Sequence, residues 1–111
     1  MPLSTHILDT ALGRPAANVS LALSKLADGE WRELGRGETD PDGRCKTLLG
    51  DIPLEAATYK LHFAVAEYYA AQKLTGLYPF IEIIFTVAQP SQHYHIPLLL
   101  TANGYTTYRG S

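Results

Sequence analysis

The sequence predicts an all-β fold, a small sandwich or barrel of about eight strands with one short helix. Two observations carry this prediction. Apolar and polar residues alternate along most of the chain, and Gly, Pro, Asn and Asp interrupt the alternation about every ten positions. With 111 residues the chain is long enough for one core and too short for two, so we expect a single domain over residues 1–111.

The first half of the chain contains strands separated by short turns. The alternation indicates strands at Leu3–Leu8, Val19–Leu26, Trp31–Gly35 and Arg44–Leu48. Because Gly tolerates positive φ and Pro and Asp favour turn positions, we expect turns at Gly13-Arg14-Pro15, Asp28-Gly29 and Pro41-Asp42-Gly43.

The second half contains the clearest alternation and the one helical segment. Strands are expected at Ala57–Val65 and Phe80–Val87, each with one apolar face, and at His93–Leu100. The segment after Leu100 is expected to extend the last strand as a hairpin. A short helix is expected over Ala66–Leu74, which is rich in Ala, Glu, Gln and Lys, with Gly76 as a left-handed cap.

The composition excludes several classes of protein. A net charge of −2, with no cluster of basic residues, gives no reason to expect nucleic acid or a membrane surface as a partner. A single cysteine, Cys45, excludes an internal disulfide, and its apolar neighbours predict a core position. The chain has no apolar run of about 20 residues and no signal peptide, so we expect a cytoplasmic protein; a mature periplasmic protein would look the same.

The histidines differ in their strand positions. His62 lies on the polar face of its strand and is expected to be an ordinary surface residue. His93 and His95 share one face with Pro97 and Leu99, while the opposite face is also apolar. Since only one face can meet the domain core, the histidine face is expected to meet a second subunit or a ligand.

The histidines are not expected to form a metal site. His6, on the first strand with Ser4 and Leu8 on its face, could join His93 and His95 as a third imidazole ligand to zinc. However, no cysteine accompanies these histidines and no supporting carboxylate is evident. We therefore expect neither a metal nor another cofactor.

Arg44 and the last four residues are the other candidates for a site. Arg44 follows the Pro41-Asp42-Gly43 turn, which would hold its side chain rigidly at a sheet end; a surface ion pair with Asp40 or Asp42 is the alternative. The chain lacks the Gly-x-Ser-x-Gly elbow of serine hydrolases. Its terminus, Tyr108-Arg109-Gly110-Ser111, places a phenol, a guanidinium and a carboxylate beside a strand, which indicates a site.

Three segments resemble the transthyretin-related proteins, specifically the 5-hydroxyisourate hydrolases. They are His6-Ile7-Leu8-Asp9-Thr10-Ala11-Leu12-Gly13-Arg14-Pro15-Ala16, Thr39-Asp40-Pro41-Asp42-Gly43-Arg44, and the stretch from His93-Tyr94-His95-Ile96-Pro97-Leu98-Leu99-Leu100 through Tyr105-Thr106-Thr107-Tyr108-Arg109-Gly110-Ser111. The resemblance covers nearly the whole chain, with no departure at the positions that this family uses for function.

The resemblance implies a Greek-key sandwich assembled as a tetramer, a dimer of dimers, with substrate sites in the channel between the dimers. It implies hydrolysis of 5-hydroxyisourate, an oxidised purine, to 2-oxo-4-hydroxy-4-carboxy-5-ureidoimidazoline. It assigns catalysis to His6, Arg44, His95, Tyr108 and Ser111, and substrate binding to His6, Arg44, Tyr108, Arg109, Gly110 and Ser111. His93 is carried over only as a possible support for these groups, and the choice of general base between the histidines stays open.

Two other functions are weighed against this one. Transthyretin itself uses the same channel to bind hydrophobic hormones, so a non-catalytic carrier is the main alternative; it is expected to lack the channel histidines and the Tyr-Arg-Gly-Ser terminus. An adhesive sandwich of the immunoglobulin type is disfavoured, because such a module has no use for imidazoles on a covered face.

Overall fold

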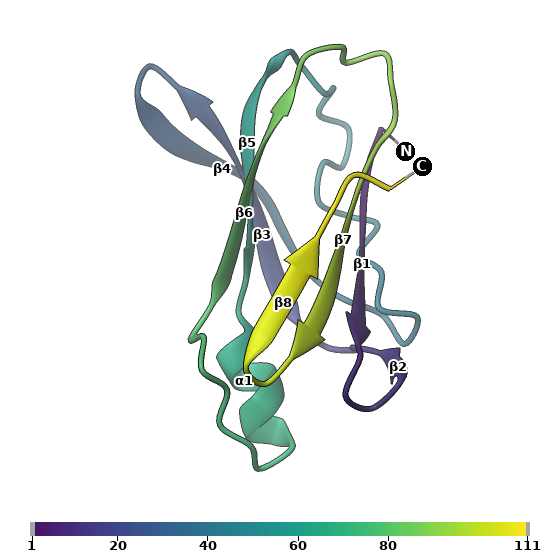
Figure 1. Ribbon diagram of the computed structural model, residues 1–111. Coiled ribbons are helices and arrows are strands. Elements are labelled where there is room, and N and C mark those ends of the chain that lie inside the picture. The colour runs from purple at the N-terminus through teal and green to yellow at the C-terminus, as the bar shows by residue number, and fades with distance from the viewer. Residues whose placement is uncertain (1, 111) are drawn as a thin grey trace.

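Two four-stranded sheets face one another in a computed structural model that describes residues 2–110 (Figure 1). One sheet has the order β2-β1-β7-β8 and is called the β1–β7 sheet; the other has the order β4-β3-β5-β6 and is called the β3–β5 sheet. The elements are β1 (Leu3–Asp9), β2 (Arg14–Pro15), β3 (Ser20–Ala27), β4 (Glu30–Glu38), β5 (Ala57–Phe63), α1 (Val65–Ala71), β6 (Ile81–Val87), β7 (Tyr94–Thr101) and β8 (Gly104–Thr107). The expected all-β sandwich with one short helix is confirmed.

The two ends of the described chain meet on β7. β1 pairs with β7 in parallel, and the register places Ser4 beside His95 and His6 beside Pro97. The Tyr94 N–H donates to the carbonyl of Pro2 over 2.8 Å, and the Gly110 N–H donates to the carbonyl of His95 over 2.8 Å. Residues from both ends of the sequence are thereby brought to the same strand (Figure 1).

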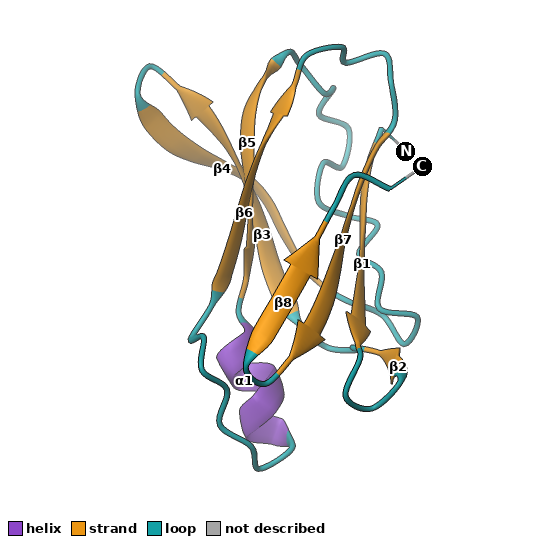
Figure 2. Cartoon of the chain, in the orientation of Figure 1, coloured by secondary structure: helices purple, strands orange, loops and turns teal. Residues whose placement is uncertain are grey.

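The β3–β5 sheet is built from antiparallel hairpins. β3 and β4 are joined by Asp28 and Gly29, whose φ angles of 53° and 77° suit the twist of a tight hairpin, so the expected turn is confirmed. β4 runs further than expected, from Glu30 to Glu38. β5 pairs with β6, and the connection between them carries α1 at the end of the sandwich (Figure 2). No helix within residues 2–110 is long and apolar enough to cross a bilayer.

The core fills the space between the sheets with the alternate residues of each strand. The fully buried side chains include Ile7 on β1, Leu98 on β7 and three residues of β5, Tyr59, Leu61 and Phe63. Because successive strand residues point to opposite faces, the residues that alternate with these along each strand point outward. Cys45 is 4% exposed, so its predicted core position is confirmed.

The strand expected at Arg44–Leu48 does not form. Arg44 makes a single bridge with His6, and the chain then runs without regular structure. Cys45, Leu48 and Leu49 are all buried, a spacing that a strand cannot place on one face. The segment also lies directly on Gly35 and Gly37 of β4, where Leu48 and Cys45 occupy the space that a Cβ would need. Burial of the apolar side chains of this segment therefore favours an irregular conformation over a strand.

Two local expectations also differ from the structure. Gly13 makes the expected turn with a φ of 69°, but Arg14 and Pro15 pair with Asp9 and Leu8 as β2 instead of belonging to the turn. The helix spans Val65–Ala71 instead of Ala66–Leu74, and the left-handed residue that follows it is Lys73, with a φ of 60°, instead of Gly76.

Candidate functional site

The outer face of the β1–β7 sheet brings together the residues of the candidate site. On β1 the core takes Thr5 and Ile7, so Ser4 and His6 project outward and are half-buried. On β7 the core takes Tyr94 and Ile96, and His95 projects outward beside Ser4. The parallel pairing of two strands nearly 90 residues apart therefore creates this cluster.

His95 is held by a short network of polar contacts. Its Nδ1 lies 2.8 Å from the hydroxyl oxygen of Ser4, and that oxygen lies 3.1 Å from Nε2 of His93. The two imidazole rings stack with centroids 6.4 Å apart. Burial lowers the pKa of His95, and the positive charges of Arg44, His6 and His93 lower it further. His95 is therefore a neutral imidazole near pH 7, able to accept a proton.

A tight turn fixes the position of Arg44. The Asp40 carboxylate accepts the backbone N–H groups of Asp42 and Arg44 over 2.9 and 3.0 Å, and Gly43 turns the chain with a φ of 77°. These hydrogen bonds, above all the one from the Arg44 N–H, lower the pKa of Asp40. The Gly43 carbonyl then accepts the Ile7 N–H over 2.8 Å, so the turn is tied to β1. The expected turn is confirmed.

The side chain of Arg44 stays available for a ligand. It is exposed and stands next to His6, with which its backbone forms the bridge. The alternative, an ion pair with Asp40 or Asp42, is not found: within residues 2–110 Arg44 makes no ion pair, because Asp40 binds backbone N–H groups instead. An exposed guanidinium that forms no ion pair with the described residues, next to two imidazoles, is suited to an anion.

The C-terminal segment lies against His95. Gly110 forms a bridge with His95, and a Cβ at position 110 would overlap its imidazole ring. Arg109 donates to the side chain of Gln92 over 3.0 Å and lies 4.3 Å above the ring of Tyr94. Tyr108 is 54% exposed, and Ser111 lies outside the described residues. Gly110 thus joins the cluster, while the guanidinium of Arg109 anchors the segment to the start of β7.

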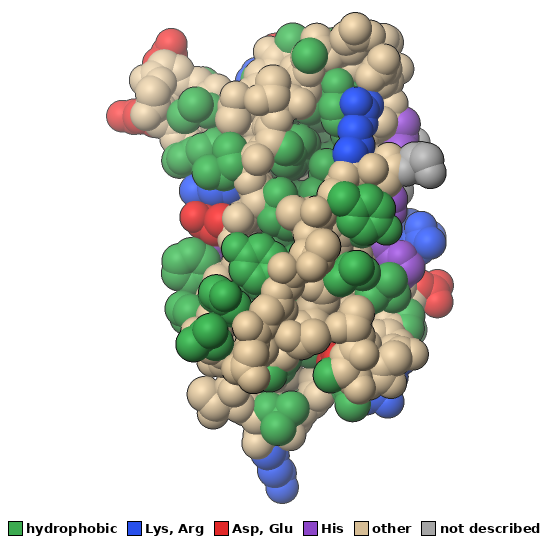
Figure 3. All heavy atoms as spheres, in the orientation of Figure 1, with side chains coloured by type: hydrophobic (Ala, Val, Ile, Leu, Met, Phe, Trp, Pro, Cys, Tyr) green, Lys and Arg blue, Asp and Glu red, His purple; other side chains and the backbone are tan. Residues whose placement is uncertain are grey.

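The electrostatic character of the cluster is basic. The charged groups that act on His95 are Arg44, His6 and His93, and each of them disfavours a positive charge on the His95 ring. The histidine side chains that show clearly in Figure 3 lie beside Lys or Arg side chains on the side of the molecule where the chain ends meet. Within residues 2–110, no group of three or more His, Cys, Asp or Glu side chains is arranged to hold a metal ion. The arrangement favours a small organic anion.

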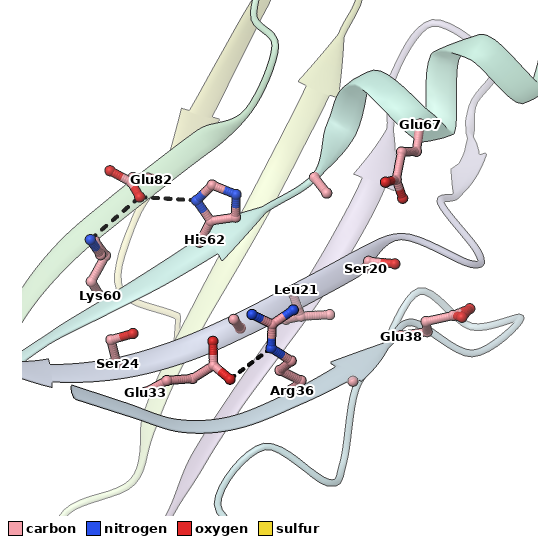
Figure 4. Close-up of a pocket in the computed structure, with 13 residues that line it drawn as sticks. Ser20, Leu21, Ser24, Glu33, Arg36, Glu38, Lys60, His62, Glu67 and Glu82 are labelled. Carbon is pink, nitrogen blue, oxygen red and sulfur yellow. Dashed lines mark hydrogen bonds and ion pairs between the residues drawn. The ribbon is translucent and has the colours of Figure 1, made fainter. Parts of the chain in front are cut away.

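Two hollows formed by the described residues lie elsewhere. One of 680 Å³ covers the outer face of the β3–β5 sheet (Figure 4), and one of 420 Å³ lies between β2 and α1. Neither is lined by His6, Arg44 or His95. In the larger one, His62 Nδ1 is 2.9 Å from the Glu82 carboxylate and its ring stacks on Phe80, which confirms the expected surface role of His62. The candidate site is thus an open face in the single chain.

A sequence model of the HIUase/Transthyretin family matches residues 3–110. The chain belongs to this family. Among its HIUase/Transthyretin relatives, a 5-hydroxyisourate hydrolase from Mus musculus is 44% identical over 112 residues, which cover 99% of this chain and 95% of the relative. The resemblance inferred from the three sequence segments is confirmed.

Solved structures of the HIUase/Transthyretin family share the fold. The 5-hydroxyisourate hydrolase of Klebsiella pneumoniae is 35% identical with a TM-score of 0.85, and the match covers 98% of this chain and 97% of that one. Sea bream transthyretin in complex with thyroxine is 34% identical with a TM-score of 0.91, and the match covers 99% and 95%. Backbone shape alone therefore does not separate the hydrolases of this family from the transthyretins, and the side chains of the site must do so.

Proposed function

We propose that this protein hydrolyses 5-hydroxyisourate to 2-oxo-4-hydroxy-4-carboxy-5-ureidoimidazoline, a step in the degradation of urate. The observation that carries the proposal is the neutral His95, set beside His6 and an Arg44 that has no ion pair within residues 2–110, and contacted by Gly110. The hydrolase names of relatives at 40% and 44% identity, which match almost the whole chain, support it.

The reaction needs a base for water and a cation for the substrate. Water loses a proton as it adds to a ring carbonyl, the C–N bond of that carbonyl then breaks, and the departing ring nitrogen receives a proton. A neutral imidazole suits the first step, and general base catalysis of this kind contributes about 10²–10⁴ in rate. His6 and His95 together activate and orient the water.

Arg44 and the C-terminal residues act on the substrate itself. The guanidinium of Arg44 binds the urate-like anion and stabilises the negative charge that develops on the carbonyl oxygen. Tyr108 and Ser111 close the pocket over the reacting ring and contribute hydrogen bonds. Arg109 and Gly110 hold the segment that carries Tyr108 against β7.

The assembly we propose is a homotetramer, a dimer of dimers with the sites at the interface between dimers. The face that carries His95 also carries Leu99, and both side chains are only partly buried in the single chain, while Pro97 between them is buried. A second subunit on this face would turn an open surface into a channel that excludes water from the reacting groups. A cytoplasmic location also stays a prediction.

A hormone or small-ligand carrier is the alternative function. The similarity to sea bream transthyretin supports the fold equally well for a carrier. The basic cluster of His6, Arg44 and His95 favours the hydrolase, because a carrier of hydrophobic ligands needs no base and no unpaired guanidinium.

The test is a spectrophotometric assay in which urate oxidase generates 5-hydroxyisourate in the cuvette and its ultraviolet absorbance is followed. The protein should accelerate the decay, and His95→Asn should remove most of the acceleration without unfolding. His62→Asn is the matched control, since His62 lies on the other sheet, and it should keep the wild-type rate. Decay at the spontaneous rate with folded wild-type protein would favour the carrier.

A further inference from the structure

The hydroxyl of Ser4 stands between two imidazoles on the outer face of the β1–β7 sheet. Its oxygen lies 2.8 Å from Nδ1 of His95 and 3.1 Å from Nε2 of His93. Ser4 is half-buried, and its strand position is fixed by the pairing of β1 with β7. The pairing of the two strands therefore holds Ser4 beside His95.

A serine hydroxyl has one proton, so it can donate to only one of these two nitrogens. Two arrangements are possible. In the first order, the Nδ1–H of His95 donates a hydrogen bond to the Ser4 oxygen, and the Ser4 hydroxyl donates to Nε2 of His93. In the opposite order, the Ser4 hydroxyl donates to an unprotonated Nδ1 of His95, and the ring proton of His95 is on Nε2. Once His95 is doubly protonated, only the first order is possible, because both of its nitrogens then donate.

The reaction itself favours the first order, because only this order keeps the 2.8 Å hydrogen bond between Ser4 and His95 when the ring becomes an imidazolium. On the opposite edge, Cδ2 and Cγ of His95 lie against Gly110. The ring is therefore held between Ser4 and Gly110, and a flip of the ring would lose the hydrogen bond to the hydroxyl.

We propose that Ser4 is a positioning residue that keeps the proton of His95 on Nδ1, which leaves the lone pair of Nε2 for the proton of the attacking water. The proposal rests on the hydrolysis proposed above. Ser4 contacts neither water nor substrate in this role; it orients the ring, fixes its tautomer and stabilises the imidazolium that forms when the water is deprotonated.

The direct test is ring ¹⁵N NMR of the full-length protein, which distinguishes protonated from unprotonated imidazole nitrogens without any turnover. In the wild type, His95 should show a protonated Nδ1 and an unprotonated Nε2 above its pKa. Ser4→Ala should lower both the fraction protonated on Nδ1 and the pKa of His95. Ser4→Thr, which keeps the hydroxyl, should restore both, and Ser24→Ala on β3 should change neither.

Kinetics give the second readout. Loss of one hydrogen bond to the developing imidazolium should lower kcat for 5-hydroxyisourate about tenfold in Ser4→Ala, with little change in KM, and Ser4→Thr should recover most of the loss. The acid limb of the rate profile should move to lower pH. The charged groups that face His95, namely Arg44 from the loop, His6 from β1 and His93 before β7, are unchanged in these variants.

The two proposals fail in different ways. A His95 with its proton on Nε2, or a tautomer and pKa unchanged in Ser4→Ala, would overturn the role of Ser4 even if wild-type turnover is fast. Absence of wild-type turnover together with the expected NMR change would overturn the hydrolase and leave the tautomer assignment supported. Thermal unfolding of each variant separates either result from a folding defect.

Discussion

At the scale of single residues, the charge state of His95 controls the proposed chemistry. Its pKa lies below the ordinary value of 6.5, because burial and the charges of Arg44, His6 and His93 disfavour the protonated ring. The base must be neutral to act, so kcat/KM should fall on the acid side and should reach its plateau at a lower pH than it would for a histidine of ordinary pKa. A pH profile of the 5-hydroxyisourate assay measures this limb.

Removal of the Arg44 charge should affect both the rate and this limb. Arg44→Gln should lower kcat/KM by about 10²-fold, since the substrate anion and the developing charge lose their cation. It should also move the acid limb to higher pH, because one of the charges that lower the pKa of His95 is gone.

Arg32→Gln is the matched control, since Arg32 pairs with Asp28 on the exposed β3–β4 hairpin. It should change neither the rate nor the limb. An acid limb of kcat/KM at the same pH in Arg44→Gln as in the wild type would contradict the electrostatic coupling between Arg44 and His95.

Alternation in the sequence predicted which strand face a residue lies on, but it did not predict contacts that depend on the register between two strands. Alternation placed His62 on a polar face and His95 on an outward face, as the structure has them. Ser4 was seen to share a face with His6, but its contact with His95 was missed. That contact depends on the parallel pairing of β1 with β7, which spacing within one strand does not reveal.

At the scale of elements, the C-terminal segment supports the ring of His95. Gly110 forms its bridge with His95 at a distance where a Cβ would overlap the imidazole. Gly110→Ala should therefore displace either the ring or the segment and lower kcat about tenfold or more, with little loss of thermal stability, because the segment adds little to the core. The measurements are the hydrolase assay and thermal unfolding.

Gly104→Ala provides the comparison within the same hairpin. A Cβ at this position would meet only the Thr101 hydroxyl at 3.6 Å, an ordinary contact, so this variant should keep wild-type activity. Equal losses in the two variants would mean that loss of glycine flexibility, and not overlap with His95, limits the rate.

Elements with regular alternation were predictable, and the segment after Arg44 was not. β1, β5, β6 and β7 follow a two-residue period and were found within a few residues of their bounds. In the stretch from Cys45 to Leu49, the side chains of Cys45, Leu48 and Leu49 are buried beside two glycines of β4, while Lys46 and Thr47 stay exposed. The close approach of this segment to the backbone of β4 is a tertiary contact, and the pattern of apolar residues along the segment does not predict it.

At the scale of the whole molecule, the single chain leaves its candidate site open. Hollows of 680 and 420 Å³ lie on other surfaces, and the histidine face carries the half-buried His6, His95 and Leu99. A site that develops charge during reaction benefits from exclusion of water. We therefore expect the proposed subunit contact to complete the site, and not merely to stabilise the fold.

Leu99→Glu tests this expectation, because a carboxylate on the histidine face would be buried without a partner in the tetramer. Light scattering coupled to size-exclusion chromatography should show the wild type as a tetramer and the variant as a smaller species. The variant should remain folded, because Leu99 points away from the core between the sheets, and it should lose most of its hydrolase activity. Leu26→Glu, at an apolar residue 38% exposed near the β3–β4 hairpin, should leave both assembly and activity intact. A fully active monomeric Leu99→Glu protein would show instead that one chain carries a complete site, and that the open face is the substrate surface itself.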